Sequence, residues 1–398
     1  MLQAWAEQLL EETAPADVID RHVTDIVAAF HTGLKTEEGQ ALAAFFGAEK
    51  IAAAAAIARL SECDDIHLAS CVTPGAVVIP VALALGAQEF HRAVAAGYAA
   101  GLRLGAAIGG AKALAAGVWP SLLAAPLMAA VTASCINGQN AGQLAHAMAL
   151  ALAGANGRPG RPIGAPSGRW FLFGEAVLRG LRASAAAGHG FRGDLELLHQ
   201  IDSAAPAASI SDVGFKPFPI ARQGANAVAA FRHLLAKGLD PHRIKAVEVH
   251  VPGINVALLN RPLAEDDRLS RLSNIGFQLA CAGLAPELLY DAERATRDAA
   301  LLQFARLVTV KPAGDLEAHL PGRWAARVVV NTDSEQLEET VIVAPFDADS
   351  PDLAHVLDEK WRRLVPPRTE TADRAVLWQE IEGCVSMAAR SRRERSKG

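Results

Sequence analysis

The chain has 398 residues, of which 51% are hydrophobic, 20% are charged and 5% are aromatic. This length suggests about two or three domains. Because aromatic residues are few, Ala, Leu and Val must fill the core, and such a composition favours closely packed helices. The formal net charge is −5, with acidic and basic residues interspersed, so the sequence indicates neither nucleic acid nor an anionic membrane as a partner.

Cysteine content and apolar segments bear on the compartment in which the protein works. The five cysteines are odd in number and show no CxxC spacing, which argues against a disulfide framework and a zinc site and fits a reducing cytoplasm. Residues 1–13 carry acids and lack the apolar core of a signal peptide. The most apolar stretch, 106–131, is interrupted by Lys112, Pro120 and Pro126, so we expect buried helices there and no membrane span.

The first half of the chain is predicted to be helical. Apolar residues recur at helical spacing from 18 to 30, and the helical pattern continues at 37–46, 51–60 and 141–153. This pattern extends to about residue 211, where the character of the sequence changes.

Four glycines recur at four-residue intervals within one of these helices. They are Gly97, Gly101, Gly105 and Gly109. Because glycine is costly in a helix interior, their repetition on one face indicates that another backbone approaches closely there. We expect this glycine stripe inside the helical domain or at a contact between subunits.

A short polar segment follows the Ala-rich run at 51–60. It holds two adjacent carboxylates, Asp64 and Asp65, together with His67. One interpretation is structural, because Asp caps the free N–H groups of a first helical turn, and Thr73 before a proline suits the start of the next helix. The other is functional, since one cap needs one Asp, and a polar loop between buried helices is a usual place for a site.

Beyond residue 211 the pattern becomes mixed. Residues 246–251 alternate between apolar and polar side chains, as in a half-buried strand. We expect four strands and three helices to form an α+β domain over residues 212–351, followed by two helices and a frayed basic tail. The other strands are expected at 307–310, 325–330 and 340–343, the closing helices at 352–364 and 371–389, and the tail at 390–398.

The polar segment resembles the MmgE/PrpD family, which includes 2-methylcitrate dehydratase, cis-aconitate decarboxylase and iminodisuccinate epimerase. The "DDTH…HPG" segment of that family is here DDIHLASCVTPG, which begins at Asp64. Further similar segments are GYA…RLG from Gly97, FKPFPIAR from Phe215 and SNIGFQLA from Ser273. The four segments occur in the family's order, and the resemblance spans nearly the whole chain.

The resemblance implies a fold, an assembly and a class of reaction. The fold is mainly α with an α+β second domain: a helical domain of residues 1–211, completed by 352–398, and an α+β lid of residues 212–351. The family forms homodimers through the helical domain and needs no cofactor or metal. Its reactions remove a proton next to a carboxylate and then eliminate water, lose carbon dioxide or reprotonate.

We therefore expect a cofactor-free lyase that acts on a small di- or tricarboxylic acid. An epimerase, racemase or other isomerase of a carboxylic acid is one alternative, and a carboxylate-binding protein without turnover is another. The reaction needs a base, an acid, and cations that bind the carboxylates and stabilise enolate charge.

Site residues follow from the family's positions. Arg169 suits bidentate carboxylate binding and cannot act as an acid near neutral pH, whereas Lys216 can carry a proton if partly desolvated. Structural ion pairs are the alternative for Lys216 and Arg222, and an ordinary surface or helix-end position is the alternative for His67. The expected catalytic residues are Asp64, Asp65, His67 and Lys216, and the expected substrate-binding residues are Thr73, Trp119, Arg169 and Arg222.

Five positions depart from the family's pattern. The Thr, His, His, Lys and His of the family are replaced here by Ile66, Thr73, Trp119, Arg169 and Leu172. The Pro-Gly and helix signals around them are intact, which favours a drier, differently arranged pocket over random decay. Trp119, which precedes a proline, is expected to shape a pocket wall.

Overall fold

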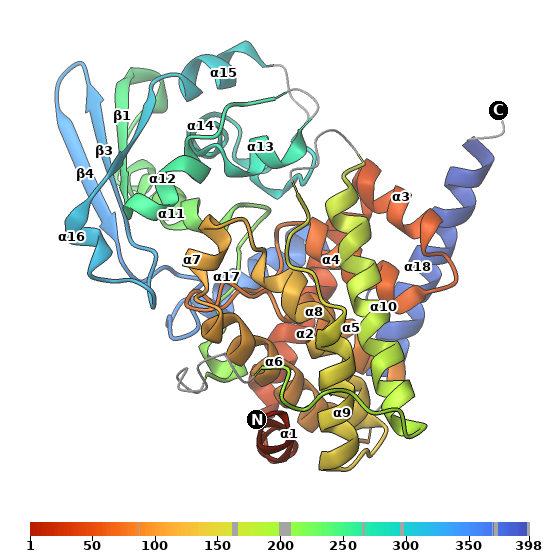
Figure 1. The fold of residues 1–398 in the computed structure, drawn as a ribbon. Helices are drawn as coiled ribbons and strands as arrows, with labels where there is room; N and C mark the ends of the chain where they lie inside the picture. The colour runs from red at the N-terminus through yellow and green to blue at the C-terminus, as the bar shows by residue number, and fades with distance from the viewer. Residues whose placement is uncertain are drawn as a thin grey trace. The chain divides into compact units, whose positions relative to one another are not determined.

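A computed structural model describes residues 1–86, 88–160, 166–198, 208–264, 267–294, 298–367, 369 and 373–395. The chain forms two compact units. The first extends over residues 1–162, 166–215 and 360–398, and the second over residues 216–359. Figure 1 shows the course of the chain through both units.

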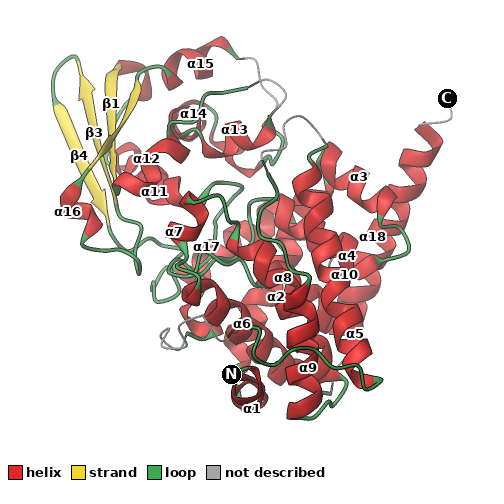
Figure 2. Cartoon of the chain, viewed as in Figure 1, coloured by secondary structure: helices red, strands yellow, loops and turns green. Residues whose placement is uncertain are grey.

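The first unit is built from helices (Figure 2), as the spacing of its apolar residues predicts. Helix α8 contacts α5, α6, α9 and α10, and so occupies the centre of this unit. The helices are α1 (Leu2–Leu10), α2 (Ala16–Leu34), α3 (Glu37–Phe45), α4 (Lys50–Leu60), α5 (Gly75–Leu85), α6 (Phe90–Ala107), α7 (Ala111–Ala115), α8 (Pro120–Ile136), α9 (Ala141–Ala153), α10 (Gly168–Gly188), the short 3-10 helix η1 (Ile210–Asp212) and α18 (Arg374–Arg395).

Alanine fills much of the space between these helices. One buried cluster joins α8, α9 and α10 through five alanines. Small side chains let helix axes approach closely, which explains how a chain poor in aromatic residues builds a dense core. The members of this cluster are Ala130, Ala147, Ala151, Ala183 and Ala187.

The glycine stripe lies inside the first unit, and its close neighbours are mostly side chains. A Cβ on Gly97 would lie 2.2 Å from Thr132 Oγ1, and one on Gly101 would lie 2.3 Å from Met128 Sδ, both on α8. A Cβ on Gly105 would meet the Val72 side chain at 2.4 Å. Gly109 does not belong to the packed stripe, because α6 ends before it and its φ is +93°.

The second unit contains a mixed four-stranded sheet with the order β2-β1-β3-β4. The central strand β1 (Ile244–Val251) pairs in parallel with β2 (Val308–Pro312) and antiparallel with β3 (Ala326–Thr332). Strand β4 (Gln336–Val341) pairs antiparallel with β3. The sheet has the expected four strands, although the strand expected at 340–343 overlaps β4 only at 340–341. A mainly α fold with an α+β second domain is confirmed.

Helices of the second unit outnumber the three that the sequence predicted. Helix α11 (Arg222–Ala236) contacts β3, β4 and α14 (Ile275–Leu284). Four of these helices are short, at four to seven residues, and such lengths are too short to show helical periodicity. They are α12 (Gly253–Leu259), α13 (Arg268–Ser273), α15 (Ala299–Ala305) and α16 (Gly314–Glu317), beside the 3-10 helices η2 (Pro241–Arg243) and η3 (Pro286–Tyr290).

The C-terminal helices follow the sequence-based expectation with one correction. Helix α17 (Leu353–Leu364) begins within the second unit and ends within the first. Helix α18 continues to Arg395, so the expected frayed tail from residue 390 is wrong for 390–395, and residues 396–398 lie outside the described part. Among the described helices, none has the length and apolar character needed to cross a membrane.

Candidate active site

Asp65 of the polar segment is bound by three hydrogen-bonding groups from three helices. Its side chain is fully buried, and its Oδ1 accepts the backbone N–H of Gly75 at 2.9 Å. Oδ2 accepts the Tyr98 hydroxyl at 2.6 Å and lies 2.8 Å from Nδ1 of His22. Because an ionised carboxylate only accepts hydrogen bonds, Nδ1 of His22 carries the hydrogen. Burial, followed by the charge of Asp65, raises the pKa of Tyr98 well above its usual range.

His22 was not foreseen from the sequence. It is 1% exposed, stacks on Phe215 with ring centres 4.6 Å apart, and meets the ring of Tyr98 edge-on. A signal was present, because His22 lies three residues after Ile19 and four before Ile26, on the apolar face of α2. A polar residue on such a face needs a buried partner, and Asp65 is that partner.

Thr73 does not cap helix α5 as expected. The helix begins at Gly75, whose N–H is bound by Asp65 instead. The backbone N–H and the hydroxyl of Thr73 both donate to Oγ of Ser121, at 3.1 and 3.0 Å. These bonds fasten the end of the polar segment to the start of α8, two residues after Trp119.

Asp64 is fully buried and binds a cation that the sequence did not single out. Nη1 of Arg59 lies 3.2 Å from Oδ1 of Asp64 and 3.1 Å from Oε2 of Glu62. Burial alone would lower the pKa of Arg59, but the charges of Asp64 and Glu62 outweigh it and hold this pKa above its usual range. Arg59 therefore stays charged inside the helical unit.

Two guanidinium groups lie against Trp119. The Cζ atoms of Arg59 and Arg169 are 5.3 and 4.9 Å from its ring centre, and both also lie within 5.7 Å of the Trp170 ring centre. Trp119 stacks in turn on Phe173, at 5.5 Å. Arg–aromatic contacts of this kind are attractive and orient the planar guanidinium. Trp119 thus forms a wall that positions two cations.

His67 is half-buried within the turn of the polar segment. Its Nδ1 accepts the N–H of Ser70 at 3.3 Å and lies 2.9 Å from Ser70 Oγ. This places the hydrogen of the neutral ring on Nε2. Burial lowers the pKa of His67 against the opposing charge of Asp212, which favours the neutral ring. In the same turn Cys71 adopts a φ of 54°, and burial raises the pKa of its thiol to about 12.

A second buried ion pair adjoins the segment. Nζ of Lys360 lies 2.5 Å from Oδ1 of Asp25 and also donates to the backbone carbonyl of Cys63. Burial raises the pKa of Asp25 to about 6, although the charge of Lys360 opposes this and that of Asp65 adds to it. Lys360 thus fixes the backbone at Cys63, where the polar segment starts, although the two residues are 297 positions apart.

The remaining expected site residues, Lys216 and Arg222, belong to the second unit. Lys216 is 1% exposed. Arg222 is also buried and binds Asp347 through Nη2, while its Nη1 donates to Asn226 at 2.7 Å. Burial lowers the pKa of Arg222, and Asp347 opposes this shift. The guanidinium is thus engaged within its own unit, and the expected proximity of these two residues to the polar segment stays a prediction.

Among the expected residues of the first unit, several meet in one neighbourhood. Arg59 joins Asp64 to Trp119, Arg169 contacts the same Trp119 ring, and Thr73 is bonded to Ser121 at the start of α8. The structure therefore assembles carboxylates and cations around one aromatic wall. Within the described residues, no group of three or more His, Cys, Asp or Glu side chains could hold a metal ion.

Of the departures from the family's pattern, Ile66 and Leu172 have structural surroundings of their own. Ile66 is buried and exchanges backbone hydrogen bonds with Gly214, at 2.9 and 3.1 Å. Leu172 is 37% exposed. The burial of Ile66 explains an apolar residue where the family has Thr. The exposure of Leu172 places it outside the buried cluster.

Comparison with known families agrees with this architecture. The model of the MmgE/PrpD N-terminal domain matches residues 49–209, and that of the MmgE/PrpD C-terminal domain matches residues 218–385. No curated protein sequence matches the chain significantly. Membership of the family supports an enzyme of dehydratase, lyase or isomerase type that acts on small carboxylic acids. The two matches cover most of the 398 residues, and the chain belongs to the MmgE/PrpD family.

Proposed function

We propose that the protein is a cofactor-free lyase that removes a proton next to a carboxylate of a small di- or tricarboxylic acid. Family membership supports the class of reaction. The observation that carries the proposal is the pair of guanidinium groups, Arg59 and Arg169, held against the ring of Trp119. A guanidinium held against an aromatic wall suits a bidentate contact with a substrate carboxylate, and we assign that contact to Arg169.

The two arginines have different parts. Arg59 is buried and already paired with Asp64 and Glu62, so we assign it no contact with the substrate and a positioning role against the ring of Trp119. Arg169 is only half-buried, and we assign it the direct bidentate contact with a substrate carboxylate. Trp119 excludes water from one side of this contact, which strengthens it.

His67 is the hydrogen-bond donor that we assign to the developing enolate. A neutral ring with its hydrogen on Nε2 donates without carrying charge, and such donors stabilise enolates in other enzymes. Asp64 and Asp65 are fully buried and already bound by donors. We therefore assign them as positioning residues, in place of the catalytic role that the sequence suggested.

The base in this proposal is Lys216, at the start of the second unit. An amine can take a proton from carbon and return it to a leaving hydroxyl. Its matching position in the family supports this role. We propose that the second unit acts as the lid that delivers Lys216, and that two chains associate through their helical units. A monomer mass by light scattering at micromolar concentration would contradict the association.

Proton NMR in heavy water tests the proposed reaction on a panel of di- and tricarboxylates. A lyase gives new vinyl signals or loss of a carboxylate, an isomerase gives deuterium exchange and a new diastereomer, and a binding protein gives shifts alone. The proposal expects the first result for at least one compound. Shifts without any exchange across the panel would refute it.

A matched pair of variants tests the part played by His67. His67→Gln keeps a side-chain N–H donor, so it should retain most of kcat. His67→Phe keeps the bulk and loses the donor, and kcat should fall by about 10²–10³, the usual effect of removing one oxyanion donor. Equal losses in both variants would exclude the donor role.

A further inference from the structure

Residues 210–215, which we call the strap, lead out of the helical unit into Lys216. The strap begins with the 3-10 helix η1, which contacts α2 and α6. The side chains of Ile210, Val213 and Phe215 are buried. The first unit ends at Phe215, and the second begins at Lys216. The strap is therefore packed into the first unit up to the residue that precedes the proposed base.

Backbone hydrogen bonds attach the strap to the polar segment. The N–H of Ile66 donates to the carbonyl of Gly214 at 2.9 Å, and the N–H of Gly214 donates to the carbonyl of Ile66 at 3.1 Å. Burial lowers the pKa of His67 and the charge of Asp212 opposes this shift, so the strap also runs near that ring. Two residues of chain span at most about 7 Å, and the Cα atom of Lys216 therefore lies within this distance of the Cα atom of Gly214.

A ring contact fixes the last residue of the strap. The ring of Phe215 stacks on the ring of His22, with centres 4.6 Å apart and an angle of 29° between the planes. Nδ1 of His22 lies 2.8 Å from Oδ2 of Asp65, and all three side chains are buried. Because the ring of His22 cannot turn without losing this bond, the bond also orients the surface on which Phe215 stacks. The contacts from Asp65 through His22 to Phe215 thus end directly before Lys216.

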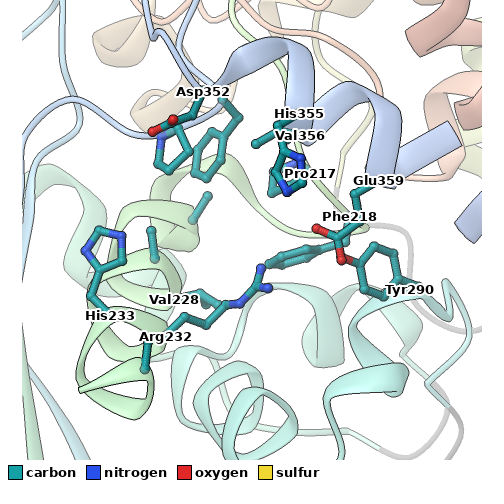
Figure 3. A pocket seen from close by; sticks show the side chains of 15 residues that line it. Pro217, Phe218, Val228, Arg232, His233, Tyr290, Asp352, His355, Val356 and Glu359 are labelled. Atoms are coloured by element: carbon teal, nitrogen blue, oxygen red, sulfur yellow. The ribbon is translucent and has the colours of Figure 1, made fainter. Parts of the chain in front are cut away.

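The chain is also held directly after Lys216, within the second unit. Pro217 and Phe218 line a pocket of about 340 Å³ (Figure 3), and Phe218 is buried. The rings of Phe218 and Tyr290 meet edge-on with centres 5.9 Å apart. Proline restricts its own φ and disfavours helical backbone at the residue before it. Lys216 therefore lies on a stiff stretch of backbone with a buried ring on each side, Phe215 and Phe218.

We propose that His22 is a positioning residue for the reaction and that it fixes the backbone of Lys216 through the ring of Phe215. This role rests on the proposed function, in which Lys216 is the base. A base must lie within hydrogen-bond reach of the proton that it takes, and a displacement of about 1 Å can lower a rate by about 10². Loss of the stack should therefore move the base, while the carboxylate contact assigned to Arg169 stays intact.

Hydrogen–deuterium exchange on the full chain, read by mass spectrometry, tests the attachment without any substrate. Phe215→Leu keeps an apolar side chain and loses the ring, whereas His22→Asn keeps a side-chain N–H donor for Asp65 and loses the stack. In each variant the peptide that contains the N–H of Gly214 should exchange about two- to twelvefold faster, the effect of losing one aromatic pair. Wild-type exchange in both variants would overturn the proposal.

His31→Gln is the matched control for both measurements. His31 is a buried histidine of the same helix, and its Nε2 lies 3.5 Å from Glu380. This variant should leave the exchange of the strap and kcat at their wild-type values. An equal change in His31→Gln would show that any buried substitution in α2 has the effect, and would overturn the specific role of His22.

Steady-state kinetics with a carboxylate that the wild type converts test the consequence for the reaction. In Phe215→Leu and in His22→Asn, kcat should fall by about 10–10² while KM stays nearly unchanged. The double variant should lose little more than either single variant, because both remove the same contact. Wild-type kcat in both variants, beside an inactive Lys216→Met, would overturn the role of His22 alone. A fully active Lys216→Met would instead refute the proposed function, and this role with it.

Discussion

Tyr98 donates its hydroxyl hydrogen to Oδ2 of Asp65 over 2.6 Å, and both side chains are fully buried. The two residues are 33 positions apart, on α6 and in the polar segment. Asp65 also binds the first N–H of α5 and the ring of His22 on α2. One carboxylate thus binds three helices, and these bonds hold the polar segment in place.

Tyr98→Phe should therefore lower the free energy of unfolding. The lost bond has a charged acceptor, for which about 1.5–3 kcal/mol is typical. Urea denaturation measures this change, and a double-mutant cycle with Asp65→Asn isolates the pair. A neutral surface substitution changes the free energy of unfolding by at most about 0.5 kcal/mol. If Tyr98→Phe changes it by no more than this, the bond does not stabilise the fold.

Much of the fold could be predicted from local patterns, whereas the hydrogen-bond and ion-pair partners within the site could not. Helical spacing and strand alternation depend on neighbouring residues, so most long helices and all four strands were found. His22 and Lys360 act through partners that folding brings together; Lys360, for example, meets Asp25 across 335 positions. No local pattern encodes such a pairing, and family positions pointed to the segment but not to these partners.

His31 should contribute to the pH dependence of the free energy of unfolding. Burial, with a smaller effect of Lys35, lowers the pKa of His31 to about 4, although Glu380 Oε1 lies 3.5 Å from its Nε2. Burial outweighs this long contact. Because the unfolded ring titrates near 6.5, its contribution is fully present above pH 6.5 and is lost as the pH falls toward 4.

His31→Gln removes this titration. Between pH 7.5 and 4, the free energy of unfolding of the wild type should fall by up to about 3 kcal/mol more than that of the variant. Chemical denaturation at each pH measures this difference. Parallel stability curves for the two proteins would show that His31 does not titrate in this range.

Gly97 tests the packing of α6 against α8. A Cβ at this position would lie 2.2 Å from Thr132 Oγ1 and 2.9 Å from Val78 Cγ2. Gly97→Ala should therefore destabilise the protein by about 1–3 kcal/mol, the usual cost of overpacking. Gly383→Ala is the control, because α18 offers open space there; it should stabilise by about 0.5–1 kcal/mol. Equal effects of both changes on the melting temperature would contradict the close contact.

Arg169 tests the proposed carboxylate clamp. Arg169→Lys keeps the charge but loses the two parallel N–H donors. The affinity for a carboxylate that the wild type binds should fall by about 1.5–3 kcal/mol, the scale for a hydrogen bond to a charged group. Calorimetry measures this, and the melting temperature should stay within a few degrees. Wild-type affinity in this variant would place the clamp elsewhere, and an unfolded variant would make Arg169 a structural residue.

The central claim is that Lys216 takes a proton from the carbon next to a substrate carboxylate. The most direct measurement is proton NMR of that carbon in heavy water, with wild type and Lys216→Met at a saturating carboxylate. The wild type should exchange the hydrogen for deuterium or eliminate it, whereas Lys216→Met should bind the compound with similar affinity and leave the hydrogen in place. Exchange by Lys216→Met at the wild-type rate would contradict the account.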